Sequence, residues 1–578
     1  MALFTRHEGT LMSAEESIDT RYRYTIWFDY TRETINSIQE GTMLAVPNFA
    51  SDERVRRWSI LEITSVMPKH FALQAGNGGY PGFVVEAARS AAQDWESQVT
   101  QSTEETTKIE VAAIPTNLEI VEAYDGSIRI SAESNIPMVG MKVRVLDSQT
   151  TNLVANNGID RENEKDIAVV GTLTRDDSVE ILLRVDELLR THFAIFGFTG
   201  VGKSNLLSTM VSKIFEAASS TVKLVFFDLM GEYTALLADQ LLSERVNGRV
   251  LSLTRQTLPE GVYQYINGLS DVDSVEAAKQ LHRQTLLPKA LLRWRKQVAY
   301  ALKDLLEGGK FKVFNDAQSV TVFDVFFTDL VGWSKDRQAV KRGERDRLQK
   351  DLLRELRLGS YKETTFTPEL ARRVREHFEQ RLEGSEFQVD FRAKIEKLGE
   401  VEAATSTNLA AGITVQDLVQ DLNDKRGHSL WVIQAHEPSQ LRIFAHRLGN
   451  ELYEARRQKG TVEPSVSFIF DEADEFVRSG GKESYELSAE VAETIARRGR
   501  KFGIGLGIAT QRIRYLDTNI MSQPHTYFIS KLPRLSDRTA VAEAFGFGNE
   551  ILNQTFKFVK GQWLLVSHEA TGLEAIPI

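Results

Sequence analysis

The sequence predicts an α/β protein: a small amino-terminal β-barrel, followed by a parallel α/β core into which an α-helical subdomain is inserted. Three observations support this expectation. Short β-rich runs fill residues 20–185, a strand, glycine loop, helix and strand follow from His192, and long helical patterns precede the next apolar strands. We therefore expect a barrel domain over residues 1–185 and a core domain over residues 186–578, with the helical insertion at about 236–430.

Eight short runs rich in β-branched and aromatic residues predict the strands of the barrel. They read YTIWFDY, GTMLAVPN, WSILEITSVMP, KIEVAAIP, IRISAES, MVGMKVRVLD, IAVVGTL and VEILLRV. Turn signals separate them, which is typical of a small antiparallel barrel. The stretch from Gly82 to Thr107 is rich in Ala, Gln, Ser and Glu, and it predicts a helix and a polar loop inserted among these strands.

The core begins with a βαβ pattern, in which the apolar run FAIFGF, a glycine-rich turn and a helical segment precede the strand KLVFFDL. No further strand of this sheet is then expected for about 200 residues, until the apolar runs SLWVIQA and SVSFIFDEAD. A helix at SAEVAETIARRGRKF, a glycine-rich strand at GIGLGIATQ and a last strand at KGQWLLVS complete the expected core.

Composition excludes several classes of protein. A chain of 578 residues is too long for one hydrophobic core, so two or three domains are expected. The absence of cysteine excludes disulfides, thiolate metal sites and cysteine nucleophiles. No apolar run approaches the roughly 20 residues of a membrane span, and the first residues do not resemble a secretory signal. We therefore expect a cytoplasmic protein that does not enter a membrane.

A complete phosphate-binding motif occupies residues 197–204, where GFTGVGKS matches G-x-x-x-x-G-K-[ST] between a predicted strand and a predicted helix. Backbone amides of such a loop and the amino end of the helix surround the phosphates of ATP. Lys203 is expected to reach the β and γ phosphates, and the Ser204 hydroxyl to bind Mg²⁺. The expected nucleotide-binding residues are Gly197, Thr199, Gly200, Val201, Gly202, Lys203, Ser204 and Asn205.

Two acids follow the apolar strand FIF. Asp471 is expected to hold the magnesium through water, and Glu472 to orient and polarise the attacking water. The alternative is that both acids merely cap the next helix, where negative charge is favoured anyway. Asp474 and Glu475 are assigned to the first turn of that helix.

Further polar residues extend the predicted site. Gln511 ends the strand GIGLGIATQ, where it could sense the γ phosphate. Asp228 and Glu232 are expected at the end of the strand next to the phosphate-loop strand. Three roles are open for them: contact with the metal's water shell, contact at an edge between subunits, or only the formation of a turn.

Six cations and no acid lie between residues 497 and 514. The cations are Arg497, Arg498, Arg500, Lys501, Arg512 and Arg514. A charge run is usually a solvated face. This one adjoins the sensor strand, which suits an arginine finger delivered to the ATP of a neighbouring subunit. Arg497 is the first candidate and Arg500 the second.

The motifs together resemble the HerA branch of the HerA/FtsK translocases. The resemblance rests on GFTGVGKS, FFDLMGEY, FIFDEADEF and IARRGRKFGIGLGIATQR followed by YLD, and the amino-terminal β region resembles the HAS-barrel of that family. It implies a RecA-like ASCE P-loop ATPase core in a homohexameric ring that translocates double-stranded DNA, with ATP and Mg²⁺ bound between subunits. It also implies that Arg190 contacts the nucleotide. The alternative is that Arg190 only anchors the linker to the barrel.

The resemblance further implies an effector that docks on the barrel, either a nuclease in DNA end processing or a sirtuin-like or nuclease effector in antiphage defence. A net charge of −10 speaks against nucleic acid as a partner, but only the local charge distribution decides. A second hypothesis is an ATP-dependent ring scaffold that regulates its effector with little translocation. A small-molecule kinase is a weaker third, since the acid pair and the sensor glutamine have no purpose there.

Overall fold

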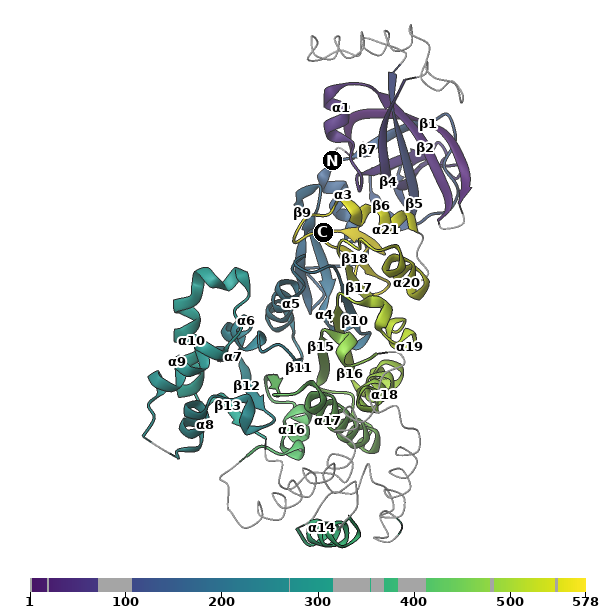
Figure 1. Ribbon diagram of the computed structural model, residues 1–578. Coiled ribbons are helices and arrows are strands. Elements are labelled where there is room, and N and C mark those ends of the chain that lie inside the picture. Colours follow the sequence, from purple (N-terminus) through teal and green to yellow (C-terminus); the bar gives the residue numbers. More distant parts are fainter. Residues whose placement is uncertain are drawn as a thin grey trace, which may run out of the picture. The chain divides into compact units, whose positions relative to one another are not determined.

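The computed structural model describes residues 3–17, 20–70, 107–269, 271–314, 354, 368–382, 412–478, 483–545 and 549–578. The chain forms two compact units (Figure 1). The first unit comprises Met1–Leu188, Phe196–Gly202 and His525–Ile578, and the second comprises Leu189–Ile195 and Lys203–Pro524. The helix and loop expected from Gly82 and much of the expected helical insertion lie outside the described residues.

An antiparallel sheet forms the amino-terminal part of the first unit. Its strands are β1 (Phe4–Ser17), β2 (Arg21–Asp29), β3 (Met43–Pro47), β4 (Val55–His70), β5 (Thr107–Ala123), β6 (Ile128–Ala132) and β7 (Lys142–Leu146). The strand order is β2-β1-β7-β3-β4-β5-β6, and β2 also pairs with β5. This extra pairing connects β5, near one end of the strand order, with β2 at the other end. Strand β1 was not predicted, because its sequence FTRHEGTLMSAEES is polar and buries only Gly9 and Leu11 fully.

The remaining elements of the first unit include a second β-pair and the carboxy-terminal strands. They are α1 (Arg32–Ser37), α3 (Ser148–Ala155), β8 (Ile167–Leu173), β9 (Asp176–Arg184), β17 (Thr526–Ile529), α20 (Leu535–Phe545), α21 (Asn549–Asn553), η8 (Gln554–Lys557), β18 (Leu564–Ser567) and β19 (Ala575–Pro577). Strands β8 and β9 pair with each other in a two-stranded sheet, although their sequences were assigned to the barrel.

A buried carboxyl group lies between β4 and η8 of this unit. The side chain of Glu62 is 7% exposed and accepts a hydrogen bond from Gln554 Nε2 at 3.0 Å. Burial raises the pKa of Glu62 to about 7, and the hydrogen bond from Gln554 opposes that rise only in part. The folded state therefore holds a proton here that the unfolded chain releases at lower pH.

The second unit is built on a parallel sheet. Its strands are β10 (Phe193–Phe196), β11 (Val222–Asp228), β12 (Val246–Ser252), β13 (Phe311–Val313), β14 (His428–Gln434), β15 (Ser465–Asp471) and β16 (Ile504–Thr510). They follow the order β13-β12-β14-β11-β15-β16-β10, and the pairs from β13 to β16 are parallel. Helix α4 (Val185–Arg190) begins in the first unit and ends in the second. The other helices of the second unit are α5 (Lys203–Ala217), α6 (Tyr233–Leu236), α7 (Ala238–Leu242), α8 (Glu260–Asn267), α9 (Ser274–Gln284), α10 (Arg295–Glu307), α14 (Pro368–Leu382), α16 (Val415–Asn423), α17 (Pro438–Lys459), α18 (Glu483–Arg498) and α19 (Thr518–Met521).

The register of the parallel strands brings polar residues to one edge of the sheet. Asp228 pairs with Gln434, and Asp471 pairs with Ala509. Because Phe227 pairs with Phe470, Asp228 and Asp471 end neighbouring strands at the same level. Parallel strands end on one side, where α/β sheets usually bind their ligands.

Two expectations about this sheet were wrong. Strand β11 does not lie next to β10, because β15 and β16 separate them in the strand order. The long stretch after β11 also contributes a strand that was not expected, because β12 pairs along its whole length with β14. Asn247, Gly248 and Arg249 interrupt the apolar pattern of β12, so its sequence does not resemble a buried strand. Within the described residues, no helix is both long and apolar enough to cross a bilayer.

We predict that Glu62→Gln stabilises the protein at high pH. The folded-state pKa of Glu62 is raised, so its contribution to stability is present below the unfolded pKa and is lost as pH rises through about 7. An amide cannot ionise, so the variant should gain roughly 2 kcal/mol over the parent between pH 5 and pH 8. Unfolding midpoints at the two pH values measure this. Exposed Glu53→Gln is the control, and a gain that does not change with pH would contradict the account.

Candidate ATP site

The loop between β10 and α5 has the backbone that a phosphate loop requires. Gly200 and Gly202 have φ angles of 87° and 110°, which side chains of L-residues rarely adopt. A Cβ on Gly197 would lie 2.8 Å from a Val201 methyl group, so a larger residue does not fit. Helix α5 then begins at Lys203, and its first N–H groups have no partner within the helix. Such an end attracts phosphate.

A buried tyrosine connects the start of α5 with the end of β15. Tyr233 is 1% exposed, and its phenol donates a hydrogen bond to Asp471 Oδ2 at 2.9 Å. The Ser204 side chain lies beside the same phenol and opposes the rise in its pKa. Burial and Asp471 raise the pKa of Tyr233, which keeps the phenol protonated. The two residues predicted to hold magnesium lie 267 positions apart in the sequence, and both lie beside this one side chain.

Asp228 builds the turn that presents this tyrosine. Its carboxylate accepts hydrogen bonds from the backbone N–H groups of Gly231 at 2.8 Å, Glu232 at 3.2 Å and Tyr233 at 3.0 Å. Gln434 Nε2 donates a further bond at 2.9 Å. Among the roles considered for Asp228, these contacts favour the formation of a turn. Sequence reasoning missed Tyr233, although it directly follows Glu232 in FFDLMGEY.

Carboxyl groups gather around Lys203. Burial, and then the charges of Asp471 and Asp228, raise the pKa of Glu232 to about 7. Burial and Asp471 raise the pKa of Glu472 to about 6, and burial raises that of Asp471. Lys203 opposes all three increases. A cation that prefers oxygen ligands, such as Mg²⁺, would relieve this repulsion, with Ser204 and Asp471 as its protein ligands.

Glu472 has an unusual backbone conformation. Its φ and ψ angles are 48° and 52°, a left-handed conformation that costs a non-glycine residue on the order of 1 kcal/mol. It precedes the short 3₁₀ turn η5 (Ala473–Glu475), but its side chain makes no capping hydrogen bond. Gln511 Nε2 instead donates to Glu472 Oε1 at 3.5 Å. The helix-cap alternative is therefore not supported for Glu472, and the predicted base and sensor lie together.

Glycines in β16 explain how this strand packs. A Cβ on Gly505 would lie 1.9 Å from the carbonyl oxygen of Leu189, and one on Gly507 would lie 2.4 Å from the ring of Phe193. Only glycine therefore permits the close approach of β16 to the chain that leads into β10. At the end of β16, the Thr510 hydroxyl donates to the buried carboxylate of Asp474 at 2.7 Å.

The arginine candidates lie at the exposed end of α18 and in the turn η6 (Gly499–Phe502). Arg497 pairs with Glu493 at 2.9 Å, and its side chain is 63% exposed. Arg500 is also exposed. Such an exposed pair contributes little stability, so Arg497 can exchange this partner at small cost. A role for either arginine at a neighbouring subunit's ATP stays a prediction.

A buried arginine that sequence reasoning missed holds this segment in place. Arg456 of α17 is fully buried, and its guanidinium donates to the carbonyl oxygens of Phe502 at 2.8 Å and Gly503 at 3.1 Å. It also donates to the carbonyl oxygens of Leu422 and Pro464. Its sequence context, EARRQK, resembles an exposed helix face. Arg190, the remaining candidate, ends α4 shortly before β10.

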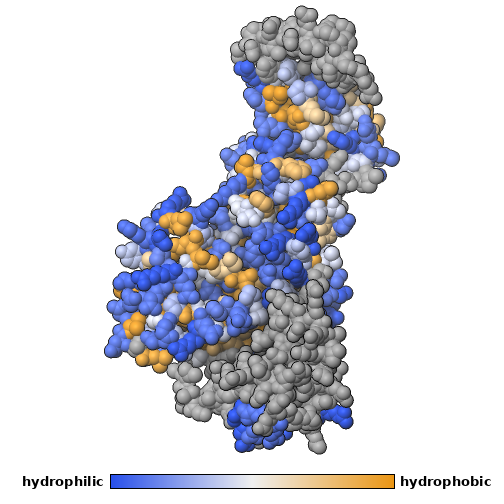
Figure 2. Space-filling view, in the orientation of Figure 1, coloured by the Kyte–Doolittle hydropathy of each residue, from blue (hydrophilic) through white to orange (hydrophobic). Residues whose placement is uncertain are grey.

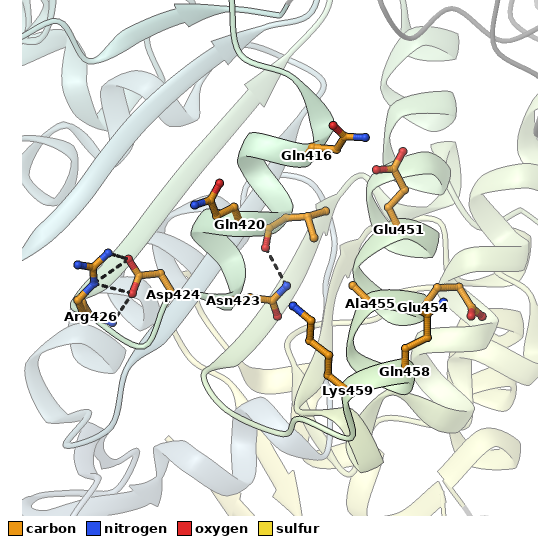
Figure 3. A pocket seen from close by; sticks show the side chains of 11 residues that line it. Gln416, Gln420, Asn423, Asp424, Arg426, Glu451, Glu454, Ala455, Gln458 and Lys459 are labelled. Carbon is orange, nitrogen blue, oxygen red and sulfur yellow. Dashed lines mark hydrogen bonds and ion pairs between the residues drawn. The ribbon is translucent and has the colours of Figure 1, made fainter.

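A polar groove of about 710 Å³ lies between α16 and α17, outside the predicted site (Figure 3). Its wall includes Gln420, Glu451 and Lys459, and Asp424 pairs with Arg426 at its margin. None of the residues that line this groove was predicted to bind nucleotide. It therefore adds no residue to the candidate ATP site.

Comparisons with known proteins point in the same direction as the site. Residues 168–265 match the family described as "Helicase HerA, central domain". The chain is 26% identical over 408 residues to the DNA double-strand break repair helicase HerA of Sulfurisphaera tokodaii, a match that covers 70% of this chain and 66% of that protein. It is 24% identical over 399 residues to the protein of the same name from Pyrococcus furiosus, covering 65% and 62%.

The chain therefore matches slightly less than two thirds of the length of these archaeal relatives. Among solved structures, VirB4 of Thermoanaerobacter pseudethanolicus aligns with a TM-score of 0.39 and 14% identity, over 73% of this chain and 97% of that chain.

We predict that Tyr233→Phe weakens the use of magnesium. The ring is retained, but Asp471 loses its hydrogen bond from the phenol and Ser204 loses the neighbouring hydroxyl. Loss of such an outer partner typically costs about 10-fold to 100-fold in metal affinity or activity. Titrations of Mg²⁺ against nucleotide binding and against ATP turnover should both shift to higher concentration. Tyr485→Phe, which removes a hydroxyl bonded to Glu475, is the matched control. Equal midpoints for both variants would contradict the prediction.

Proposed function

Because the chain is a P-loop ATPase of the HerA family, we propose that it is an ATP-hydrolysing motor that translocates double-stranded DNA. The observation that carries the proposal is the hydrogen bond from Tyr233 to Asp471 beside Ser204, with Lys203 among the surrounding carboxylates. A phosphate loop with an acid pair beside it suits the hydrolysis of a nucleotide. The DNA substrate is proposed from the relatives' names and from the sequence motifs.

Each residue of the site has a proposed task. Lys203 binds the β and γ phosphates, while Ser204 and Asp471 hold Mg²⁺, which would neutralise phosphate charge. Glu472 orients a water molecule against the γ phosphorus and accepts its proton as the bond to ADP breaks. With its pKa raised to about 6, Glu472 is mostly ionised at neutral pH and can act as this base. Gln511 holds Glu472 and senses the γ phosphate.

The assembly that we propose is the one that the resemblance to this family implies. We propose a homohexameric ring with ATP between subunits, in which Arg497 or Arg500 contacts the neighbour's γ phosphate. The closed amino-terminal sheet is proposed to be a HAS-barrel, on which a nuclease or a sirtuin-like effector docks. The pathway would be DNA end processing or antiphage defence, and Arg190 is proposed to contact nucleotide.

We predict that duplex DNA raises the ATPase rate of the protein and that Glu472→Gln abolishes this turnover while ATP still binds. Loss of a general base typically lowers the rate about 10²-fold to 10⁴-fold. The control is Glu486→Gln, which changes an exposed glutamate of α18. Stimulation by DNA distinguishes a motor from an ATP-dependent scaffold. A rate that duplex DNA does not change, at any length tested, would count against the motor.

We predict that rings mixed from Arg497→Ala and Glu472→Gln subunits regain activity, because some interfaces then combine two intact halves. Random mixing at equal amounts should restore up to about a quarter of the sites if the arginine acts on its neighbour. Mixing Lys203→Ala with Glu472→Gln is the control, since both residues serve their own subunit's site and no intact site can form. Absence of rescue with Arg497→Ala at every ratio excludes this arginine as the finger.

A further inference from the structure

A helical hairpin of the second unit carries an unusual concentration of positive charge. Helices α9 and α10 pack against each other, and the residues that join them include the 3₁₀ turn η3 (Lys289–Trp294). Residues 277–303 contain seven lysines and arginines but no aspartate or glutamate, in a chain whose net charge is −10. We refer to residues 279–303 as the cationic hairpin.

Most of these cations form no ion pair with an acid among the described residues. Lys279 and Lys303, at the two ends, pair with Glu276 at 3.7 Å and Glu307 at 2.7 Å. Five other cations are exposed and form no ion pair with any residue that the structure describes. These are Arg283, Lys289, Arg293, Arg295 and Lys296. Their mutual repulsion is thus not offset within the described part of the chain.

The five cations lie close to the point where the two helices meet. Burial, and then the charge of Arg295, lower the pKa of His282 in the last turn of α9, so the start of α10 lies beside the end of α9. Arg295 and Lys296 also occupy the first turn of α10, where the helix dipole disfavours positive charge. This arrangement is costly in the isolated chain, and an anionic partner would offset the cost.

Exposed rings lie among these cations. The exposed fractions of Trp294 and Tyr300 are 47% and 69%, and the guanidinium of Arg293 lies 5.5 Å from the centroid of the Trp294 ring. Hydrophilic and hydrophobic residues accordingly alternate over the part of the surface formed by α8, α9 and α10 (Figure 2). Cations that follow a backbone, together with rings on which bases stack, are what proteins use to bind single-stranded nucleic acid.

We propose that the cationic hairpin binds single-stranded nucleic acid, with phosphates on its five unpaired cations and bases stacked on Trp294 and Tyr300. A duplex would use the cations but not the rings, because its bases already stack on one another. The inference extends the proposed DNA motor, for which the hairpin would hold an unpaired strand at a DNA end. Binding itself needs neither ATP nor turnover, so it is tested separately from the motor.

The test is the binding of a fluorescent oligothymidylate to the full chain without nucleotide, measured by anisotropy across a range of salt concentrations. The triple variant Arg293→Ala, Arg295→Ala, Lys296→Ala should lower the slope of log affinity against log salt by about 2, since each phosphate contact of a single strand contributes about 0.7. Trp294→Ala should weaken binding about 10-fold while the salt slope is unchanged.

The matched control removes the same charge elsewhere in the second unit. Lys425→Ala, Arg457→Ala and Lys459→Ala together change three exposed cations, of which Lys425 and Arg457 lie beside Glu463 and Glu454. This control should keep the parent affinity and the parent salt slope. Thermal unfolding of every variant verifies that it folds.

Three results would overturn the proposal. The first is oligothymidylate binding by the triple variant that equals binding by the control. The second is a loss on Trp294→Ala that is the same for duplex and for single strand. The third is hairpin variants that lose their oligomeric state but keep nucleic acid binding. The last result would assign the hairpin to contacts between copies of the chain. ATPase stimulation by duplex DNA, measured on the same samples, shows independently whether the motor proposal holds.

Discussion

The hydrogen bond from the buried Tyr233 phenol to Asp471 is the interaction on which the ATP site depends. It holds the carboxylate that ends β15 beside Ser204 in the first turn of α5, and Asp228 fixes the tyrosine in turn. The ends of β11, β14 and β15 are thereby held by hydrogen bonds that link Asp228, Gln434, Tyr233 and Asp471, of which all but Gln434 are buried. Buried polar networks of this kind define one geometry, because an unsatisfied member costs free energy.

The charges of the site point to its ligand. Asp471, Glu472 and Glu232 have raised pKa values because they share a buried region, and the charge of Lys203 opposes this rise only in part. A nucleotide alone would add negative charge to this region. A divalent cation bound with the nucleotide would supply positive charge that balances part of the phosphate charge. The strained backbone of Glu472 belongs to the same pattern, since strain is commonly retained where a side chain must be aimed.

The sequence predicted the strands of the core and the main groups of the site where local patterns were strong. The motif GFTGVGKS and the acids after FIF needed no long-range information. Strand β12 was missed because Asn247 and Arg249 interrupt the apolar pattern that indicates a buried strand. The order of β11 and β10 was wrong because strand order depends on contacts between residues distant in the chain. Tyr233 and Arg456 were missed for the same reason, as their partners lie far away in sequence.

The central claim is that nucleotide is held where α5 begins. The most direct measurement is the affinity of the protein for a fluorescent ATP analogue with Mg²⁺, for the parent, Lys203→Ala and Lys213→Ala. Lys213 lies on the same helix but pairs with Glu216 at 3.6 Å on its surface. The account predicts that Lys203→Ala loses most of its affinity and that Lys213→Ala keeps it. Equal affinity of all three proteins would contradict it.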